Sequence, residues 1–317
     1  MLPLLRRSLI PAALLASAVA AHAQDAATTT SAWTWSFGVG QALESFHWHE
    51  TSSDQWWRPV GTNENGRTVY DVVDRGQVLF LQEDGGRNNT FAKAWLEFVP
   101  GMRLVARFGY TYASVSYDGG LQPSLSASAA TWPLDSTEME GATYYQYRRI
   151  PYATSTGYFG PDLEVGFELR PRHRLGSFFP RAELAYCYSS LRRKVAYTTT
   201  RASGYDEVWT RDWVRLAGGP GWSTCNGELL LSFGLRQPLS TVEDVQKVSG
   251  GADISPVTLK PEARTAWETS LAWESRFGLD MKVRYSRQIF DESPSVGGSL
   301  QPDSYEGVTR FEVGWNF

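Results

Sequence analysis

Residues 305–317 carry an alternating pattern of apolar and polar side chains, which limits what the chain can fold into more than any other feature of the sequence. One face of this segment holds Tyr305, Phe311, Val313, Trp315 and Phe317, and the other holds Glu306, Arg310, Glu312, Gly314 and Asn316. A period of two is the repeat of a β-strand. A strand with one apolar face and one polar face is typical of a membrane β-barrel, where the apolar side chains meet lipid.

Other segments of the chain share this pattern, with boundaries uncertain by a few residues. Besides 305–317, the strand-like segments are 33–49, 90–98, 102–117, 156–170, 180–197, 206–218, 227–239, 263–275 and 279–291. Residue 77 is an alternative start for the second of the ten strands. We therefore predict an all-β fold. It is a transmembrane antiparallel up-and-down β-barrel of ten strands, with eight or twelve strands as the alternatives.

Short and long connections alternate between these segments. Tight turns with Gly, Pro or Asn lie around 99–101, 225–227 and 276–278, and a slightly longer turn lies at 171–179. The long connections are 51–86, 118–155, 240–262 and 292–304. Short periplasmic turns and long extracellular loops are the bacterial barrel arrangement. We expect residues 122–140, which contain a Ser/Ala/Thr run, to be flexible or lid-like. Whether the loop 118–155 folds inward as a plug is open.

The segment 67–82 is ambiguous in the sequence. Residues 68–73 and 77–81 are both rich in β-forming residues, and Asp74-Arg75-Gly76 between them is a plausible turn. We predict a hairpin that stands above the membrane. If the segment crossed the membrane instead, the barrel would have twelve strands.

The start of the chain has the pattern of a cleaved secretory signal peptide. Arg6 and Arg7 precede an apolar stretch at 9–21, which is shorter than the ~20 apolar residues that span a bilayer. Ala21-His22-Ala23 matches the small-x-small cleavage pattern. We predict a signal peptide at 1–23 and one outer-membrane barrel domain at 24–317.

The closing segment resembles the terminal signature of single-chain outer-membrane barrel proteins of Gram-negative bacteria, including porin-like and uncharacterised barrel families. The residues that carry this resemblance are Phe311, Val313, Trp315 and Phe317. The resemblance implies a place in the outer membrane and partners in outer-membrane lipid, lipopolysaccharide and the barrel-assembly machinery. It implies no activity, because a fold alone does not specify one.

Composition excludes some other functions. The net charge of −4 gives no reason to expect nucleic-acid binding. Cys187 is predicted on the lumen side of a strand and Cys225 in a periplasmic turn, which is too far apart for an obvious disulfide. No motif indicates a cofactor or a resident metal, and the oligomeric state is open.

Alternation also predicts which charged residues face the interior. The signs nearly balance, and buried charges are tolerated only when they are paired or hydrated. A barrel of eight to ten strands is only wide enough for its own side chains. We therefore expect an interlocked network of lumen charges in place of an open pore, formed by Arg103, Arg107, Glu164, Glu168, Arg215, Arg236, Glu268, Lys282, Arg284, Arg310 and Glu312.

One local cluster could carry chemistry. His47 and His49 share a face of the first strand near the predicted outer rim, a spacing suited to a base or a pair of metal ligands, and Glu44 or Asp54 could add a carboxylate. The alternative is an aromatic girdle at the membrane boundary, formed by Phe46, Trp48, Trp56 and Trp57. A Ser–His lipid hydrolase is also conceivable there, although no serine stands out in the sequence.

The predicted topology is similar to that of the omptin proteases, which use paired acidic residues opposite an Asp–His pair. No Asp-x-His occurs here, and His173 lies in a periplasmic turn, so protease activity does not carry over. Acidic pairs at 83–84, 206–207, 243–244 and 291–292 are predicted in outer loops, either simply solvated or binding cations that bridge lipopolysaccharide. The sequence thus favours a structural, surface-binding or narrow-passage barrel, with a lipid- or peptide-hydrolysing rim enzyme near His47 and His49 as the alternative.

Overall fold

The computed structural model describes residues 33–121, 133–171, 177–196, 204–249, 252–253, 256–297 and 300–317. Every regular element in these ranges is a β-strand. No helix in them is long and apolar enough to cross a membrane. The predicted signal peptide at 1–23, and residues 122–132 of the loop expected to be flexible, lie outside the described residues.

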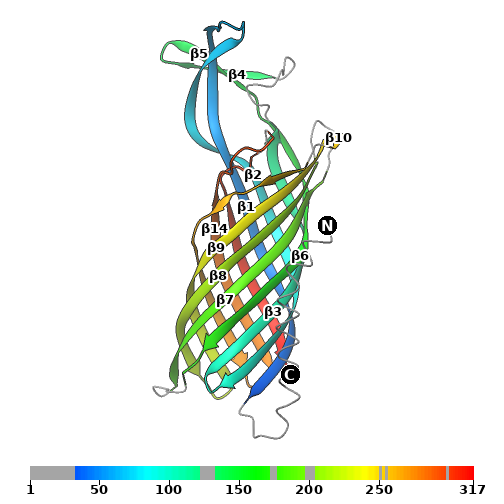
Figure 1. Ribbon diagram of the computed structural model, residues 1–317, viewed down its shortest axis with the longest axis vertical. Coiled ribbons are helices and arrows are strands. Elements are labelled where there is room, and N and C mark those ends of the chain that lie inside the picture. The colour runs from blue at the N-terminus through cyan, green and yellow to red at the C-terminus, as the bar shows by residue number, and fades with distance from the viewer. Residues whose placement is uncertain are drawn as a thin grey trace.

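Ten strands pair in sequence as a closed antiparallel ring, in which β15 pairs with both β14 and β1 (Figure 1). They are β1 (Thr34–Thr62), β2 (Thr68–Val99), β3 (Met102–Leu121), β6 (Ile150–Leu169), β7 (Phe178–Val195), β8 (Gly204–Ser223), β9 (Gly227–Ser249), β13 (Ala266–Ser275), β14 (Leu279–Asp291) and β15 (Ser304–Asn316). The predicted all-β antiparallel fold is confirmed. We refer to this barrel-like ring as the barrel.

The remaining strands are short and lie at one end of the barrel, which is uppermost in Figure 1. They are β4 (Leu134–Met139), β5 (Ala142–Tyr147), β10 (Ala252–Asp253), β11 (Val257–Leu259) and β12 (Glu262–Ala263). At the opposite, lower end the fully described connections, at 100–101, 224–226 and 276–278, are tight turns. In the left-handed region, Gly101 has φ +83° and Gly278 φ +93°, which other residues rarely adopt.

The seam between β1 and β15 closes the barrel. The two strands pair without a register shift from Gly38–Asn316 to Glu50–Ser304. Closure removes the unpaired backbone edge that an open sheet would leave. The four residues of the predicted terminal signature, Phe311, Val313, Trp315 and Phe317, project from the outer surface at the lower end of this seam.

The two faces of the barrel wall differ in chemistry. Along β9, Leu231, Phe233 and Leu235 are exposed on the outer surface, whereas the alternate residues Ser232 and Arg236 face inward. The same alternation on the other strands produces an exposed apolar belt around the barrel. Its members include Phe37, Val39, Leu43, Phe108, Phe167, Leu184, Leu216, Leu229, Leu271, Met281, Val283, Phe311 and Val313.

A long hairpin rises from the upper end of the barrel and corrects the prediction for 51–86. Residues 51–62 continue β1 and pair with 68–79 of β2, which we call the upper hairpin. Its turn is at 63–67, where the Asn63 side chain accepts hydrogen bonds from the backbone N–H groups of Asn65 and Arg67. Residues 74–76, predicted as a turn, instead lie within β2 as an irregularity, opposite the register shift between Ser53 and Gln55 of β1. The backbone N–H of Gly76 donates a hydrogen bond to the Asp74 carboxylate.

The described part of the predicted loop 118–155 is also ordered as strands. β4 and β5 form a hairpin that contacts the upper hairpin through the pairing of Trp57 with Tyr145. Tyr144 donates a 2.7 Å hydrogen bond to Asp71, and Gln146 donates one of 2.7 Å to Asp54. These strands lie beside the upper hairpin and outside the barrel, so residues 133–149 do not form a plug (Figure 1). We call the upper hairpin together with β4 and β5 the β platform.

Candidate functional site

Charged side chains from all around the barrel meet in its lumen. At mid-height the guanidinium of Arg215 is only 1% exposed. It contacts Glu164 at 2.8 Å and Glu268 at 3.5 Å, and it also contacts Glu183. Arg284 approaches Glu164 at 3.7 Å. Each carboxylate that has lost water is thus compensated by an arginine, as burial requires.

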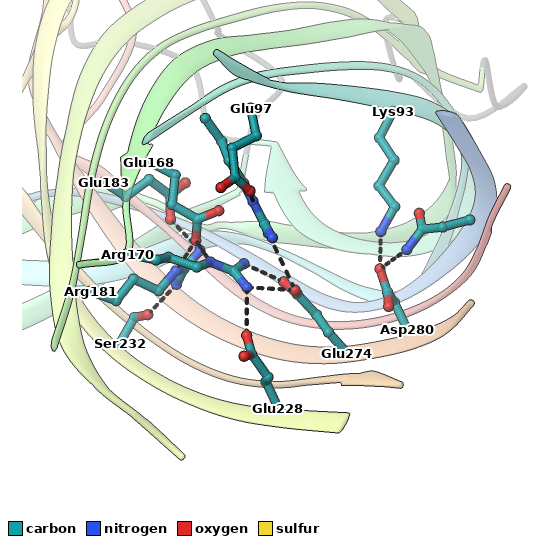
Figure 2. A network of polar contacts seen from close by, with 12 residues as sticks. Lys93, Glu97, Glu168, Arg170, Arg181, Glu183, Glu228, Ser232, Glu274 and Asp280 are labelled. Atoms are coloured by element: carbon teal, nitrogen blue, oxygen red, sulfur yellow. Dashed lines mark hydrogen bonds and ion pairs between the residues drawn. The ribbon is translucent and has the colours of Figure 1, made fainter. Parts of the chain in front are cut away.

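A second group of ion pairs fills the lower end of the lumen (Figure 2). Arg170 contacts Glu274 at 2.6 Å, and it contacts Glu228 and Glu168 at 3.0 Å each. Arg181 joins Glu168 and donates to Glu183 at 2.9 Å. One arginine therefore ties together carboxylates from three strands, which links the wall across the lumen.

A third group lies in the upper half of the lumen. Arg87 joins Glu44 at 2.8 Å and Glu306 at 3.4 Å, and Arg310 reaches Glu44 at 3.1 Å. Closer to the upper end, the buried Arg193 contacts Glu83 and Glu207 at 2.7 Å each and Glu50 at 3.5 Å. Every arginine in these contacts projects inward from the wall.

An aromatic layer crosses the lumen at its upper end. The ring of Trp48 lies 5.1 Å from that of Trp209 and 5.5 Å from that of Phe290, and Phe46 lies 5.1 Å from Tyr158. The guanidinium of Arg87 stands 4.0 Å from the ring centroid of Phe46. All five rings are buried, with at most 5% exposure. This aromatic layer therefore packs buried rings from β1, β6, β8 and β14 together inside the barrel near its upper end.

Two cavities are lined by the lumen charges. A cavity of 110 Å³ lies at mid-height among Glu44, Arg87, Arg211, Glu268 and Arg284, and a cavity of 240 Å³ opens at the lower end beside Arg103, Arg170 and Glu228. The aromatic layer and the ion pairs lie along the path between the two ends.

The structure places every residue of the predicted lumen network on the inner face. Ion pairs connect Arg103, Arg107, Glu164, Glu168, Arg215, Glu268, Arg284, Arg310 and Glu312 to one another or to other lumen charges. Arg236 stacks over the ring of Trp213 at 4.4 Å and donates to Ser286 at 3.2 Å. Among the described residues, Lys282 has no carboxylate within ion-pair distance.

The sequence did not predict several charged residues of the lumen network. Arg87 and Glu83 lie outside 90–98, the segment first predicted as the second strand, and Arg170 is the last residue of a predicted strand, where alternation gives little guidance. The acidic pairs predicted in outer loops lie in strands or at a strand end, so alternation turns one member of a pair inward. Glu83, Glu207 and Glu243 are buried in this way, which corrects the loop interpretation.

The structure separates the predicted rim cluster. His47 and His49 project from the outer surface of β1, whereas Glu44 faces the lumen and pairs with Arg87. His47 contacts Asp84 of β2 through Nδ1, and its Nε2 lies 3.4 Å from Ser45 Oγ. His49 Nδ1 lies 2.5 Å from the hydroxyl of Tyr305. Asp54 lies on the upper hairpin, away from both imidazoles.

The alternative of an aromatic girdle is also corrected. Phe46 and Trp48 occupy the inward positions of β1 and belong to the aromatic layer, because the same alternation that turns His47 outward turns them inward. Trp56 and Trp57 lie on the upper hairpin. Within the described ranges, no group of three or more His, Cys, Asp or Glu side chains is arranged to hold a metal ion. Cys187 is buried, Cys225 is exposed, and both are free.

No family model and no curated relative matches the sequence. The chain is similar to the outer membrane protease OmpT from Escherichia coli, with 11% identity and a TM-score of 0.48, over 91% of this chain and 98% of that one. It is also similar to the translocator domain of the autotransporter NalP from Neisseria meningitidis, with 12% identity, a TM-score of 0.37 and 98% of both chains covered. A third similar structure, the Ralstonia pickettii toluene transporter TbuX, shows 8% identity and a TM-score of 0.34 over 89% of both chains. These names agree with the class of barrels that the sequence resembles.

Proposed function

We propose that this protein is a ten-stranded outer-membrane β-barrel with a closed lumen, and that it acts as a non-conducting anchor for the β platform on the cell surface. The observation that carries this proposal is the aromatic layer of Phe46, Trp48, Tyr158, Trp209 and Phe290 above the lumen ion pairs. A pore needs a hydrated path, and rings packed about 5–6 Å apart leave none at this height.

The apolar belt supports a place in the membrane. Trp35 and Leu43 on β1 are 74% and 56% exposed, and they are separated by eight residues, or roughly 26 Å along a strand at ~3.3 Å per residue. With a strand tilt of about 40°, this corresponds to roughly 20 Å along the barrel axis, close to the ~25 Å apolar band of outer-membrane barrels. A water-soluble protein rarely exposes an apolar surface of this extent. We propose that lipid covers it and that lipopolysaccharide meets the polar surface above.

The β platform has the internal contacts of a fixed structure. Trp57 packs against Tyr70 at 5.2 Å and against Tyr145 at 5.6 Å between ring centroids. Arg58 and Tyr144 both donate to Asp71, and these hydrogen bonds, that of Tyr144 above all, lower the pKa of the Asp71 carboxyl. β1 and β2 continue from the barrel into the upper hairpin, with a register shift between Glu50 and Thr51 at the junction, so two paired strands join the platform to the wall.

Excision of the upper hairpin tests this division of roles. Ser52 and Val78 are cross-strand partners, so residues 53–77 can be replaced by an Asn-Gly turn that joins the two strands directly. The expected variant still forms the compact, heat-modifiable barrel in outer membranes and retains no conductance. In intact cells, a protease-cleavage sequence inserted in the 63–67 turn of the full-length protein should be cut by the matching added protease, whereas the excised variant, which keeps β4 and β5, has no such turn. A platform protected from protease in intact cells would contradict a surface role.

Recognition by the barrel-assembly machinery is part of the same proposal. The outward residues Phe311, Val313, Trp315 and Phe317 lie on the strand that closes the barrel, where an unpaired edge in lipid would cost several kcal/mol for each backbone group. Assembly of the barrel therefore depends on the pairing of β15 with β1.

A further inference from the structure

Three side chains on the outer surface of the barrel are arranged like a Ser–His–Asp triad. Ser45 and His47 are two residues apart on β1 and so share its outward face. Asp84 is the cross-strand partner of His47 on β2 and faces the same way. We propose that Ser45, His47 and Asp84 form a hydrolase site that cleaves acyl esters of phosphorylated lipids at the outer surface of the barrel.

The two imidazole nitrogens of His47 have different partners. Nδ1 contacts Oδ1 of Asp84, and Nε2 lies 3.4 Å from Ser45 Oγ. With the Asp84 carboxylate at Nδ1, that nitrogen keeps its proton and Nε2 is left as the base. The Ser45–Nε2 distance is longer than a formed hydrogen bond, as is common in catalytic sites without substrate.

Asp84 is itself held in place. Gln82, on the same face of β2, donates to Oδ2 of Asp84, so both carboxylate oxygens are engaged. Ser116 of β3 donates a 2.7 Å hydrogen bond to the backbone carbonyl of Asp84. These contacts fix the carboxylate that orients the imidazole, which is the supporting structure that such a site needs.

Glycines flank the triad on the neighbouring strands. Gly86 is the cross-strand partner of Ser45, and Gly307 is that of His47 on β15. A Cβ built on Gly86 would meet nothing closer than a backbone oxygen at 3.9 Å, and one on Gly307 would meet only His47 at 3.9 Å. Gly307 is buried, whereas Gly86 is exposed. The lack of a side chain at Gly86 therefore leaves room for a substrate beside Ser45.

The region around Gly86 is also irregular in the sheet. Pairing between β2 and β3 is continuous on both sides but skips Gly85 and Gly86, between the pairs Asp84–Ser116 and Arg87–Ala113. Asn88 is the next outward residue of β2 and is diagonal to Ser45. Diagonal neighbours on adjacent strands are ~7–8 Å apart, a distance that a side chain can bridge. Within the described part of the chain its amide has no hydrogen-bond partner, so it can donate to the oxyanion formed at a substrate carbonyl.

The position of the triad selects the substrate, and this choice rests on the proposed place in the membrane. Directly below Ser45 on the outer face are Leu43 and Phe311, members of the apolar belt that are paired across the seam. Arg287 on β14 lies beyond Gly307, with its guanidinium 4.6 Å from the ring centroid of Tyr305 and no carboxylate partner among the described residues. A lipid with its chains on the belt would place its ester at Ser45 and a phosphate near Arg287.

The reaction follows from these groups and water. Ser45 Oγ attacks the ester carbonyl carbon while Nε2 of His47 takes the hydroxyl proton. The tetrahedral intermediate then breaks its bond to the alcohol oxygen, which receives that proton and leaves as the lyso-lipid. Water next attacks the acyl-Ser45 carbonyl and gives a proton to His47, the bond to Oγ breaks, and Oγ regains the proton as the fatty acid leaves.

Covalent labelling tests the nucleophile directly. The full-length protein, refolded in detergent, is treated with a fluorophosphonate probe, and the labelled peptide is identified by mass spectrometry. We expect labelling at Ser45, lost in Ser45→Ala and retained in Ser114→Ala, a control that removes another exposed outward serine nearby. Asp84→Asn should slow labelling at least a hundredfold, and Asp84→Glu should partly restore it. Heat-modifiable migration verifies that each variant is folded. Labelling equal in wild type and Ser45→Ala would overturn the proposal.

Fatty-acid release tests the substrate class. Mixed micelles contain either phosphatidylethanolamine or purified lipid A, and a neutral p-nitrophenyl ester serves as the comparison. We expect fatty-acid release from one of the two phosphorylated lipids, at a rate at least about a thousandfold lower in Ser45→Ala. This result would support the site, and the lipid that is cleaved would identify the source of the substrate. Arg287→Ala should raise KM for that lipid and leave the neutral ester unaffected. Hydrolysis of the neutral ester alone, or of nothing, would overturn the assignment. Conductance and surface proteolysis do not depend on Ser45, so a failure here is distinguishable from a failure of the anchor proposal.

Discussion

Buried arginines hold the barrel wall together across its lumen. Arg215, Arg193 and Arg170 each contact carboxylates from at least two other strands, so each one links parts of the wall that the backbone ladder does not join directly. Removal of such a guanidinium leaves the carboxylates buried without a counter-charge, which costs more than the pair itself contributes. The loss of stability should therefore be much larger than the loss caused by removing one partner of a solvent-exposed ion pair.

Arg215→Met measures this difference against a matched control. We expect it to lower the free energy of unfolding by about 3–5 kcal/mol, because Glu164 and Glu268 lose their partner. Arg148→Met removes an exposed pair with Asp135 on the β platform and should leave the free energy of unfolding nearly unchanged, because water screens such pairs. Urea unfolding of the refolded protein in lipid, followed by tryptophan fluorescence, gives both values. Equal effects of the two substitutions would show that the lumen pairs are not structurally important.

The Asp71 contact makes the β platform sensitive to acid. Its carboxyl has a pKa below the ordinary 3.8 because Tyr144 and then Arg58 donate to it. A lowered pKa in the folded protein means that the stabilisation is present above pH 3.8 and is lost as the pH falls through the lower folded value. Tyr144→Phe removes the larger contribution, so the Asp71 pKa should move upward. Carboxyl ¹³C NMR titration of both proteins measures this, and an Asp71 that titrates above 3.8 in the wild type would contradict it.

Sequence alternation assigned a face to individual residues but could not pair them. Glu164, Arg215 and Arg284 follow the inward positions of strands that were recognised, so their direction was predictable. The partner of His47 was not, because Asp84 was assigned to a loop and cross-strand contacts depend on register. Glu44 was grouped with the histidines by proximity in sequence, whereas a period of two places it on the opposite face.

The sequence did not predict that β1 and β2 extend into the upper hairpin. The barrel strands were found because one apolar face must meet lipid or the core, which imposes a period of two. Above the apolar belt both faces of β1 and β2 meet water, and that constraint disappears. Ser52, Asp54 and Gln55 then resemble loop residues, although pairing with β2 makes them a strand.

The turn at 63–67 should determine the stability of the upper hairpin. Gly66 has φ +73°, a conformation that a β-branched residue tolerates poorly, and a Cβ there would meet no other atom. Gly66→Val therefore tests backbone strain alone and should destabilise the hairpin by about 1–2 kcal/mol. Hydrogen exchange of 55–73 should become roughly 5–30 times faster, with exchange in β9 unchanged. Unchanged exchange in the hairpin would show that its turn is not limiting.

With the lumen closed as proposed and the outer wall apolar, the solvent-facing chemistry of this protein is outside the barrel. The outer surface offers two candidate sites, the β platform and the triad at the upper edge of the apolar belt. The β platform exists because β1 and β2 are longer than the other strands. The triad lies lower, where β1 still pairs with β15 and β2 with β3.

Single-channel recording tests the closed barrel most directly. The purified full-length protein is inserted into a planar lipid bilayer in 1 M salt, with a trimeric porin as the positive control for insertion and detection. We expect no steady conductance from the wild type, because the aromatic layer around Trp48 and Trp209 and the ion pairs of Arg193, Arg215 and Arg170 lie along the path. A large, steady conductance in the wild-type protein would contradict the closed lumen and the anchor function built on it.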